Sequence, residues 1–435
     1  MTRLNIPGIT ALILLFLPAC KHYFGNPYPH AQAPKTVPAA GDALLVEPPN
    51  WWVGMSHRRV EVMVCRAGIC EFEAQLGEAQ GITLEKADKS AGPDSLFLTL
   101  NIAPDAPPQR LPLIFAKPGN DFQFTVEFPV FRRNTAPKAQ GLEPRHVLFR
   151  PEGKTEFPVS DLNRLQDWGF TAIWLPAEKI YGAVGPGSGA EQFRDWVRQC
   201  HYRDIRVVRD LIPLLPGVDP CSPELNSKWY HAVLQQALWW VEYAGLDGFR
   251  LDSCLHTEPS WLKRLGRDIC AEYPAIYLEY IDEDPFKNIL IPGDESMARL
   301  LSAGDRFSSP AAVLLTSPGL PVIIANTDSL QTRDTSGFVR TLIRYRNTTP
   351  VLQTGQMEVF PLADGMYAWF RFDAAKTVLV LLNTSGIEKS VGLESFATRL
   401  NGFTGAKDAI SGRVLLGLTG IRVHGNAVSV LEMMK

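Results

Sequence analysis

Two acidic residues follow short apolar segments, at positions where a carboxyl group can do nucleophilic or acid–base chemistry. Asp252 ends the stretch GFRLD, and Glu279 lies in the stretch AIYLEY. Arg250 lies two positions before Asp252, and the period-two alternation of a strand puts both side chains on one face. Because a neighbouring guanidinium keeps a carboxylate ionised, this pattern favours a catalytic carboxylate held by a cation.

The strands that carry the two acids are predicted to be neighbours. Only one helical stretch, residues 260–274, separates them, so they are expected side by side in a parallel sheet, about 4.8 Å apart. Retaining glycosidases need a nucleophile and an acid/base whose carboxyl groups lie about 5–5.5 Å apart. The same pattern also fits surface acids that cap the next helix, and spacing alone does not decide between the two interpretations.

Three zones of different pattern surround these residues. Residues 43–138 carry short alternating strands between Gly, Pro and Asn turns, which predicts a β-sandwich domain. Residues 145–348 alternate strands with helices, which is typical of parallel βαβ units and of the α/β class. In this zone a helix over about 224–244 places one apolar stripe toward a core. Residues 349–435 return to strands and predict an antiparallel C-terminal β-domain.

The N-terminus has the pattern of an export signal. Residues 1–20 place Arg3 before an apolar run that ends in LPAC, as in a bacterial lipobox, which predicts cleavage before a lipidated Cys20. A plain signal peptide with an incidental cysteine is the alternative. Residues 21–42 are rich in Pro, Ala, His and Lys and suit a flexible tether. We therefore expect a lipid-anchored protein of the bacterial cell envelope, on the periplasmic face or the cell surface.

Composition and cysteine spacing exclude several classes of partner. The net charge is −3 without a basic run, which gives no support for nucleic-acid binding. The chain has neither a Gly-rich phosphate loop nor zinc spacing, so no cofactor and no metal is expected. Export permits disulfides, and Cys65 and Cys70, which flank RAGI, are predicted to bridge a hairpin. The remaining cysteines are expected to be buried thiols: Cys200, Cys221, Cys254 and Cys270.

Several motifs together resemble the α-amylase family of glycoside hydrolases, in particular its exported neopullulanase- and cyclomaltodextrinase-like members. GFRLDSCLH resembles the nucleophile motif, which implies Asp252 as nucleophile, Arg250 as its partner and His256 as the closing histidine. IYLEY resembles the acid/base motif and implies Glu279 in that role. IRVVRDLIP resembles the strand whose Asp, here Asp210, contacts substrate.

The resemblance extends over nearly the whole mature chain. VEPPNWWVGM, residues 46–55, resembles the opening of the family's N-terminal domain, and LNGFTGAKDAISG, residues 400–412, resembles its C-terminal domain. The implied fold is a (β/α)8-type barrel between an immunoglobulin-like β-sandwich and a C-terminal antiparallel β-domain. Because residues 145–348 barely reach the length such barrels need, we expect a barrel that is minimal or lacks one or two βα units.

The sequence departs from the family at several polar positions. Leu214 and Leu215 stand where the family has Asn and His, so a calcium site is not expected. Ser302 and Ala303 stand where the family has the His and Asp of its third catalytic motif. IIANTDS resembles that lost motif only superficially, because it follows the stretch that precedes the last barrel strand. The family's Tyr-His-Gly-Tyr stretch is reduced to IYGAV, which leaves Tyr181 as a candidate substrate contact.

Two functions of different classes are compatible with this pattern. In the first, an envelope-anchored hydrolase acts on α-glucans such as maltooligosaccharides, cyclodextrin or pullulan by a retaining mechanism, with Asp252 as nucleophile and Glu279 as acid/base. In the second, a catalytically impaired relative binds glucan or a protein partner at the envelope. Either protein would contact the membrane through the lipid anchor only. Both a monomer and a homo-oligomer are compatible with the sequence.

Overall fold

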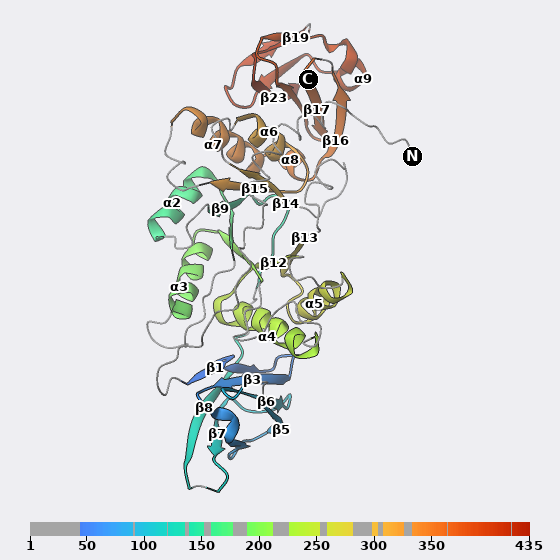
Figure 1. Ribbon diagram of the computed structural model, residues 1–435. Coiled ribbons are helices and arrows are strands. Elements are labelled where there is room, and N and C mark those ends of the chain that lie inside the picture. The colour runs from blue at the N-terminus through green and yellow to red at the C-terminus, as the bar shows by residue number, and fades with distance from the viewer. Residues whose placement is uncertain are drawn as a thin grey trace.

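The structure is a computed structural model, in which strands at both ends of the chain flank a central parallel sheet with helices (Figure 1). No described helix is long and apolar enough to cross a membrane. The residues that the structure describes are 44–89, 92–119, 121–134, 139–151, 158–176, 189–211, 226–252, 259–281, 298–302, 308–325, 333–362, 364–418 and 420–435.

The N-terminal strands form a sandwich of two four-stranded sheets, ordered β1-β3-β6-β5 and β2-β8-β7-β4. Alternating residues of both sheets, such as Val62 and Leu98 in one and Leu113 and Phe128 in the other, are fully buried between them. The elements are β1 Leu45–Glu47, β2 Trp51–Val53, β3 Arg59–Cys65, η1 Ile69–Glu71, β4 Glu73–Leu76, β5 Ile82–Lys89, β6 Ser95–Ile102, β7 Gln109–Ala116 and β8 Gln123–Arg132.

The predicted bridge between Cys65 and Cys70 is wrong, because both residues are free thiols. After Cys65 ends β3, the chain enters the short helix η1 instead of a hairpin strand, so the two residues do not face each other across a ladder. Cys65 Sγ lies 3.2 Å from Ser95 Oγ, and Cys70 Sγ donates to the carbonyl of Ser95 at 3.2 Å. Each thiol is thus satisfied separately on β6.

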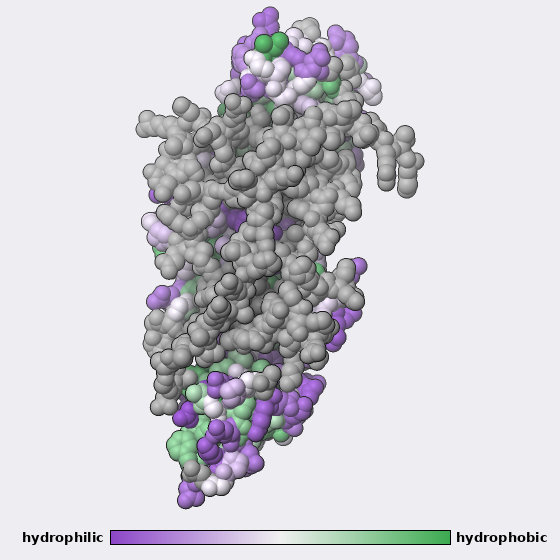
Figure 2. All heavy atoms as spheres, in the orientation of Figure 1, coloured by the Kyte–Doolittle hydropathy of each residue, from purple (hydrophilic) through white to green (hydrophobic). Residues whose placement is uncertain are grey.

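The surface of this domain mixes polar and apolar side chains (Figure 2). Its most exposed large apolar residues are Leu44, Phe122 and Phe131, each between 40% and 48% exposed. They come from three different segments of the chain, and isolated apolar side chains of this kind are ordinary on protein surfaces. We assign no function to them.

The central region is a parallel sheet of seven described strands, ordered β13-β12-β11-β10-β9-β15-β14. Its helices lie between successive strands along the chain, as in βαβ units (Figure 1). The elements are β9 Leu148–Pro151, α2 Val159–Trp168, β10 Ala172–Leu175, α3 Gly189–His201, β11 Arg206–Asp210, α4 Asn226–Ala244, β12 Gly248–Asp252, α5 Pro259–Glu272, β13 Tyr277–Ile281, β14 Ala298–Ser302, α6 Ser308–Thr316, β15 Leu320–Ala325, α7 Arg333–Asn347 and α8 Pro350–Thr354.

The sheet has two different faces, because successive side chains of a strand point to opposite sides. One face packs on the helices, with Phe149, Ile173 and Phe249 in the large core shared with them. The other face forms a separate small cluster around Leu148 and Trp174. The curled sheet therefore has an inner face, as in a barrel.

The long helix α4 confirms the stripe expected from sequence. Its buried residues are Tyr230, Val233, Leu234, Ala237, Leu238 and Val241 among others. The helix stops at Gly245, whose φ of +78° is left-handed and whose N–H donates to the Val241 carbonyl at 2.9 Å. Glycine adopts this conformation without the steric cost of a Cβ, so the chain can turn directly into β12.

The barrel is incomplete among the described residues, as expected from its length. β15 pairs with β9, so β15 is in the position of the last strand of a (β/α)8 barrel and β14 in that of the seventh. The strands β9 to β13 are consecutive neighbours and take the first five positions. The described strands thus leave the sixth position of such a barrel without a member, between the edges β13 and β14.

The C-terminal strands form an antiparallel sheet ordered β16-β17-β18-β23-β20-β21, with a second two-stranded pair β19-β22. Their core, which includes Phe370, Leu381 and Leu431, is a separate cluster. The elements are β16 Gln356–Pro361, β17 Met366–Phe372, β18 Thr377–Asn383, β19 Lys389–Val391, η5 Leu393–Phe396, α9 Ala397–Leu400, β20 Gly405–Asp408, β21 Val414–Leu416, β22 Ile421–Val423 and β23 Ala427–Met434.

The N-terminal sandwich docks on α4 and α5 through polar contacts. The Gln235 side chain pairs with both backbone groups of Glu61, accepting from its N–H at 2.7 Å and donating to its carbonyl at 2.9 Å. Arg133 donates to Glu242 at 3.0 Å and also pairs with Glu272. Because both carboxylates are almost fully buried, this arginine compensates their charge and fixes the sandwich to the barrel.

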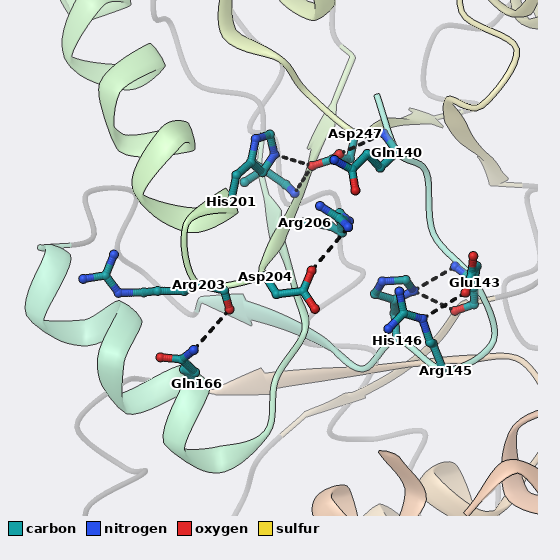
Figure 3. A network of polar contacts seen from close by, with 11 residues as sticks. Gln140, Glu143, Arg145, His146, Gln166, His201, Arg203, Asp204, Arg206 and Asp247 are labelled. Atoms are coloured by element: carbon teal, nitrogen blue, oxygen red, sulfur yellow. Dashed lines mark hydrogen bonds and ion pairs between the residues drawn. The ribbon is translucent and has the colours of Figure 1, made fainter. Parts of the chain in front are cut away.

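A second polar network lies where β11 and β12 begin, at the amino ends of the barrel strands (Figure 3). The buried Asp247 carboxylate accepts from the Val207 N–H at 2.8 Å and from the Gln140 N–H at 3.1 Å, and it lies 2.8 Å from His201 Nε2. These contacts tie the segment before β9 to α3 and β11. They lie at the end of the strands opposite Asp252, so we assign them to stability.

Candidate active site

Three neighbouring strands bring three charged residues into one row. In the parallel ladders, Asp210 of β11 is opposite Arg250 of β12, and Arg250 is opposite Glu279 of β13. All three residues are buried, between 6% and 8% exposed. The predicted adjacency of β12 and β13 is therefore confirmed, and Asp210 is added to the same row.

Asp252 is the last residue of β12, two positions beyond Arg250 toward the carboxyl end of the strand. Its partner in β13 is Ile281, so it lies one row above Glu279 on the neighbouring strand. Asp252 thus ends its strand and Glu279 lies two residues before the end of β13, near the carboxyl ends of the strands where enzymes of this fold carry their active sites.

Trp174 of β10 lies below this row and contacts two of its members. Its indole Nε1–H donates to Asp210 Oδ1 at 2.7 Å, and the Arg250 guanidinium carbon lies 4.0 Å from the centre of its ring. The guanidinium of Arg150, from β9, lies 4.5 Å from the same ring centre. Cations placed over an indole are attracted by the ring's quadrupole, so Trp174 joins β9, β10 and β12 inside the barrel.

The environment of Glu279 favours its protonated form. Burial raises the pKa of Glu279 from 4.5 to about 7, while the Arg250 charge lowers it and the Asp210 charge adds to the rise. A carboxylic acid that keeps its proton near neutral pH can protonate a leaving group. The site therefore contains an acid whose proton affinity suits general acid catalysis.

Tyr277 lies one row below Glu279 on the same strand, and burial raises its pKa well above the ordinary value. Its ring packs against Gly248, where an added Cβ would lie 2.6 Å from the Tyr277 carbonyl and 2.8 Å from its Cβ. Gly248 is therefore required for the close approach of β12 and β13. Among the described residues, the Tyr277 hydroxyl has no hydrogen-bond partner.

The remaining site predictions fall mostly outside the described residues. Tyr181, His256 and Cys20 are outside them, and so is the Leu214–Leu215 pair. Ser302 is the last residue of β14, opposite Ile324 of β15. By topology this strand is in the position of the seventh strand of a (β/α)8 barrel.

Sequence reasoning missed the contacts of Trp174 and Arg150. The signal for Trp174 was its inward position in the strand stretch TAIWLP, two residues after Ala172, but a buried tryptophan has no chemical signature of its own. No group of three metal-ligating side chains occurs among the described residues. The chemistry of the described site is that of carboxyl groups beside guanidinium groups.

Comparisons with protein-family models match both flanking domains. Residues 45–134 match the N-terminal domain of cyclomaltodextrinase, and residues 357–432 match the C-terminal domain of cyclo-malto-dextrinase. These two matches cover the sandwich and the C-terminal sheet on either side of the row of charged residues.

Solved structures with a similar fold include two α-amylases and a cyclomaltodextrinase. The chain resembles the acarbose complex of an α-amylase from Geobacillus thermoleovorans with 14% identity and a TM-score of 0.54, covering 67% of this chain and 99% of that one. A maltogenic α-amylase from Thermotoga neapolitana matches with 14% identity and a TM-score of 0.53 over 68% and 100% of the chains. A cyclomaltodextrinase matches with 14% identity and a TM-score of 0.53 over 90% and 99%.

The two family-model matches and the fold agree with the motifs of β11, β12 and β13. Both flanking domains match cyclomaltodextrinase models, and the chain has the fold of the α-amylases and the cyclomaltodextrinase named above, with a barrel that is incomplete among the described residues.

Proposed function

We propose that the protein hydrolyses α-glucans by a retaining mechanism, with Asp252 as nucleophile and Glu279 as acid/base. In the first step, Glu279 protonates the glycosidic oxygen while the Asp252 carboxylate attacks the anomeric carbon, and a covalent glycosyl-enzyme forms. In the second step, Glu279 takes a proton from water, which displaces Asp252. Both groups return to their starting protonation states, so the cycle needs no cofactor.

The observation that carries this proposal is the burial of Glu279 in register with Arg250, on the strand next to the one that ends in Asp252. Burial supplies the raised pKa that an acid needs, and Arg250 offers a charge that keeps a nucleophilic carboxylate ionised. Arg250 and Asp210 are proposed as substrate contacts beside the two acids, together with Tyr181 and His256.

The substrate class rests on the family and its relatives. The flanking domains match cyclomaltodextrinase models, and one enzyme of similar fold was solved with acarbose. We therefore propose maltooligosaccharides, cyclodextrin or pullulan as substrates. The export signal that ends at Cys20 supports a lipid anchor in the cell envelope.

A second candidate function is supported by the end of β14. The seventh-position strand ends in Ser302, which stands at the family's His, and the sequence continues with Ala303 where the family has its third acid. Transition-state hydrogen bonds of that kind are worth about 2–4 kcal/mol each. Without them the protein would act as a glucan-binding relative of the enzymes, or bind a protein partner.

The test is product release by purified residues 21–435 from maltooligosaccharides, cyclodextrin and pullulan. We expect turnover that falls by about 10²–10⁴ in Glu279→Gln and at least as much in Asp252→Asn, because each removes a group of the double displacement. Saturable glucan binding without turnover in the folded wild type would instead support the second candidate. Turnover that survives both substitutions would contradict the proposed roles.

A further inference from the structure

The Trp174 indole N–H and the Arg250 guanidinium lie at very different distances from Asp210 Oδ1. The Trp174 indole N–H is 2.7 Å away, which is a short hydrogen bond between two buried groups. Arg250 NH1 is 3.7 Å away, beyond hydrogen-bond range. A guanidinium beside a carboxylate ordinarily closes to about 2.7–2.9 Å. The indole N–H therefore binds one of the two oxygens that a closed Asp210–Arg250 ion pair would use.

The ring of Trp174 is itself held from both sides of β10. Arg150 comes from β9, which is next to β10, and Arg250 comes from β12, which lies on the other side of β10 beyond β11. With both guanidinium groups within 4.5 Å of the ring centre, the indole cannot turn away from Asp210 without giving up these contacts.

This arrangement has a consequence for Glu279. The charged and titratable groups that face Glu279 among the described residues are Arg250 of β12, Asp210 of β11 and Tyr277 of its own strand. Arg250 and Asp210 act on Glu279 in opposite directions. If Asp210 closed onto Arg250, the positive charge would be compensated locally and its influence on Glu279 would weaken.

We propose that Trp174 is a positioning residue of the active site: its indole N–H holds Asp210 back from a closed ion pair and so keeps the charge of the Arg250 guanidinium acting on Glu279. The inference rests on the proposed function for its catalytic meaning. The geometry it invokes can be tested without turnover.

The variant Trp174→Phe removes the N–H donor and retains an aromatic ring for the two guanidinium groups. We expect Asp210 to close onto Arg250 and the titration midpoint of Glu279 to rise by about 0.5–1 pH unit. The readout is the carboxyl ¹³C resonance of labelled glutamate, assigned with Glu279→Gln. The matched control is Trp168→Phe, a buried tryptophan of α2 that stacks on Phe170 away from the site. It should leave the midpoint unchanged.

The route through Asp210 is tested by a double-mutant cycle. In an Asp210→Asn background, Trp174→Phe should cause no further shift, because no carboxylate remains to close onto Arg250. Asp210→Asn alone should lower the midpoint, and this arm carries the test if Trp174→Phe does not fold. An unchanged midpoint in Trp174→Phe, or in Asp210→Asn, would overturn the proposal, as would an equal shift in both backgrounds.

Steady-state kinetics of the same variant provides a separate test of the proposal. If the wild type turns over maltooligosaccharides, Trp174→Phe should lower kcat at least about tenfold with KM within about twofold, since the effect is on charge placement in the transition state. A change in KM of similar size, with kcat unchanged, would contradict the positioning role. A wild type without turnover would refute the proposed function, while the Glu279 titration would still decide the role of Trp174.

Discussion

Replacing Arg346 with methionine is expected to destabilise the protein by about 4 kcal/mol or more. This fully buried guanidinium of α7 donates to five backbone carbonyls, and it joins the last helical unit of the barrel to the segment that enters its first strand. Hydrogen bonds from a charged donor contribute about 1.5–3 kcal/mol each, so losing even two without compensation reaches the expected range. The acceptors are the carbonyls of Leu315, Ser317, Leu352, Pro144 and Gly319, at 2.7–3.2 Å.

The matched control is Arg344→Met, which changes the arginine two residues before Arg346 on the same helix. Arg344 is exposed and donates to the Asp167 carbonyl at the surface, so its loss should cost less than about 1 kcal/mol. Urea unfolding followed by circular dichroism measures both variants. Equal unfolding midpoints for Arg346→Met and wild type would contradict the importance of this cluster for an incomplete barrel.

The second large effect is a change in how stability depends on pH. The folded-state pKa of Glu279 is raised to about 7 by burial, above its ordinary 4.5. A group with a raised folded pKa stabilises the protein fully below the unfolded pKa, and this stabilisation is lost as the pH rises through the folded pKa. Glu279→Gln should therefore gain about 3 kcal/mol relative to wild type between pH 4.5 and pH 8.

The measurement is the free energy of unfolding in urea at pH values across that window. Glu127→Gln is the control, because Glu127 is an exposed carboxylate that pairs with Arg110 in the N-terminal sandwich, outside the barrel. A constant difference between Glu279→Gln and wild type from pH 4.5 to pH 8 would show that Glu279 titrates normally. That result would remove the main support for its role as an acid.

Much of the barrel was predictable because it depends on local patterns. The alternation in GFRLD and AIYLEY identified β12 and β13, and the single helix between them required that they be parallel neighbours. The stripe of α4 and its stop at Gly245 followed from helical periodicity and from the left-handed turn that glycine permits. These features need no knowledge of distant parts of the chain.

Features that depend on distant contacts were not predictable. The Trp174–Asp210 hydrogen bond joins residues 36 positions apart, and nothing in TAIWLP distinguishes this indole from a purely apolar one. Arginine in an amphipathic helix is ordinarily a surface residue, so the sequence gives no indication that Arg346 is buried among backbone carbonyls. The Cys65–Cys70 bridge was wrong because the spacing did not reveal that the chain enters η1 instead of a second strand.

The number of barrel strands was predictable only in part. Length alone indicated a shortened barrel but not which unit was short. The pairing of β15 with β9 and of β14 with β15 identifies β14 as the seventh-position strand, and this pairing is a long-range property. Ser302, which stands at the family's His in the sequence motif, is the last residue of that strand.

The central claim is that Asp252 and Glu279 have separate roles in one double displacement. Fluoride release from α-maltosyl fluoride tests it directly. In this reaction the Asp252 carboxylate forms the bond to the anomeric carbon, and fluoride leaves with the bonding electrons without needing a proton. We predict that wild type and Glu279→Gln release the first equivalent of fluoride at similar rates, whereas Asp252→Asn releases none. Release by Asp252→Asn at the wild-type rate, or no release by the folded wild type, would contradict the account.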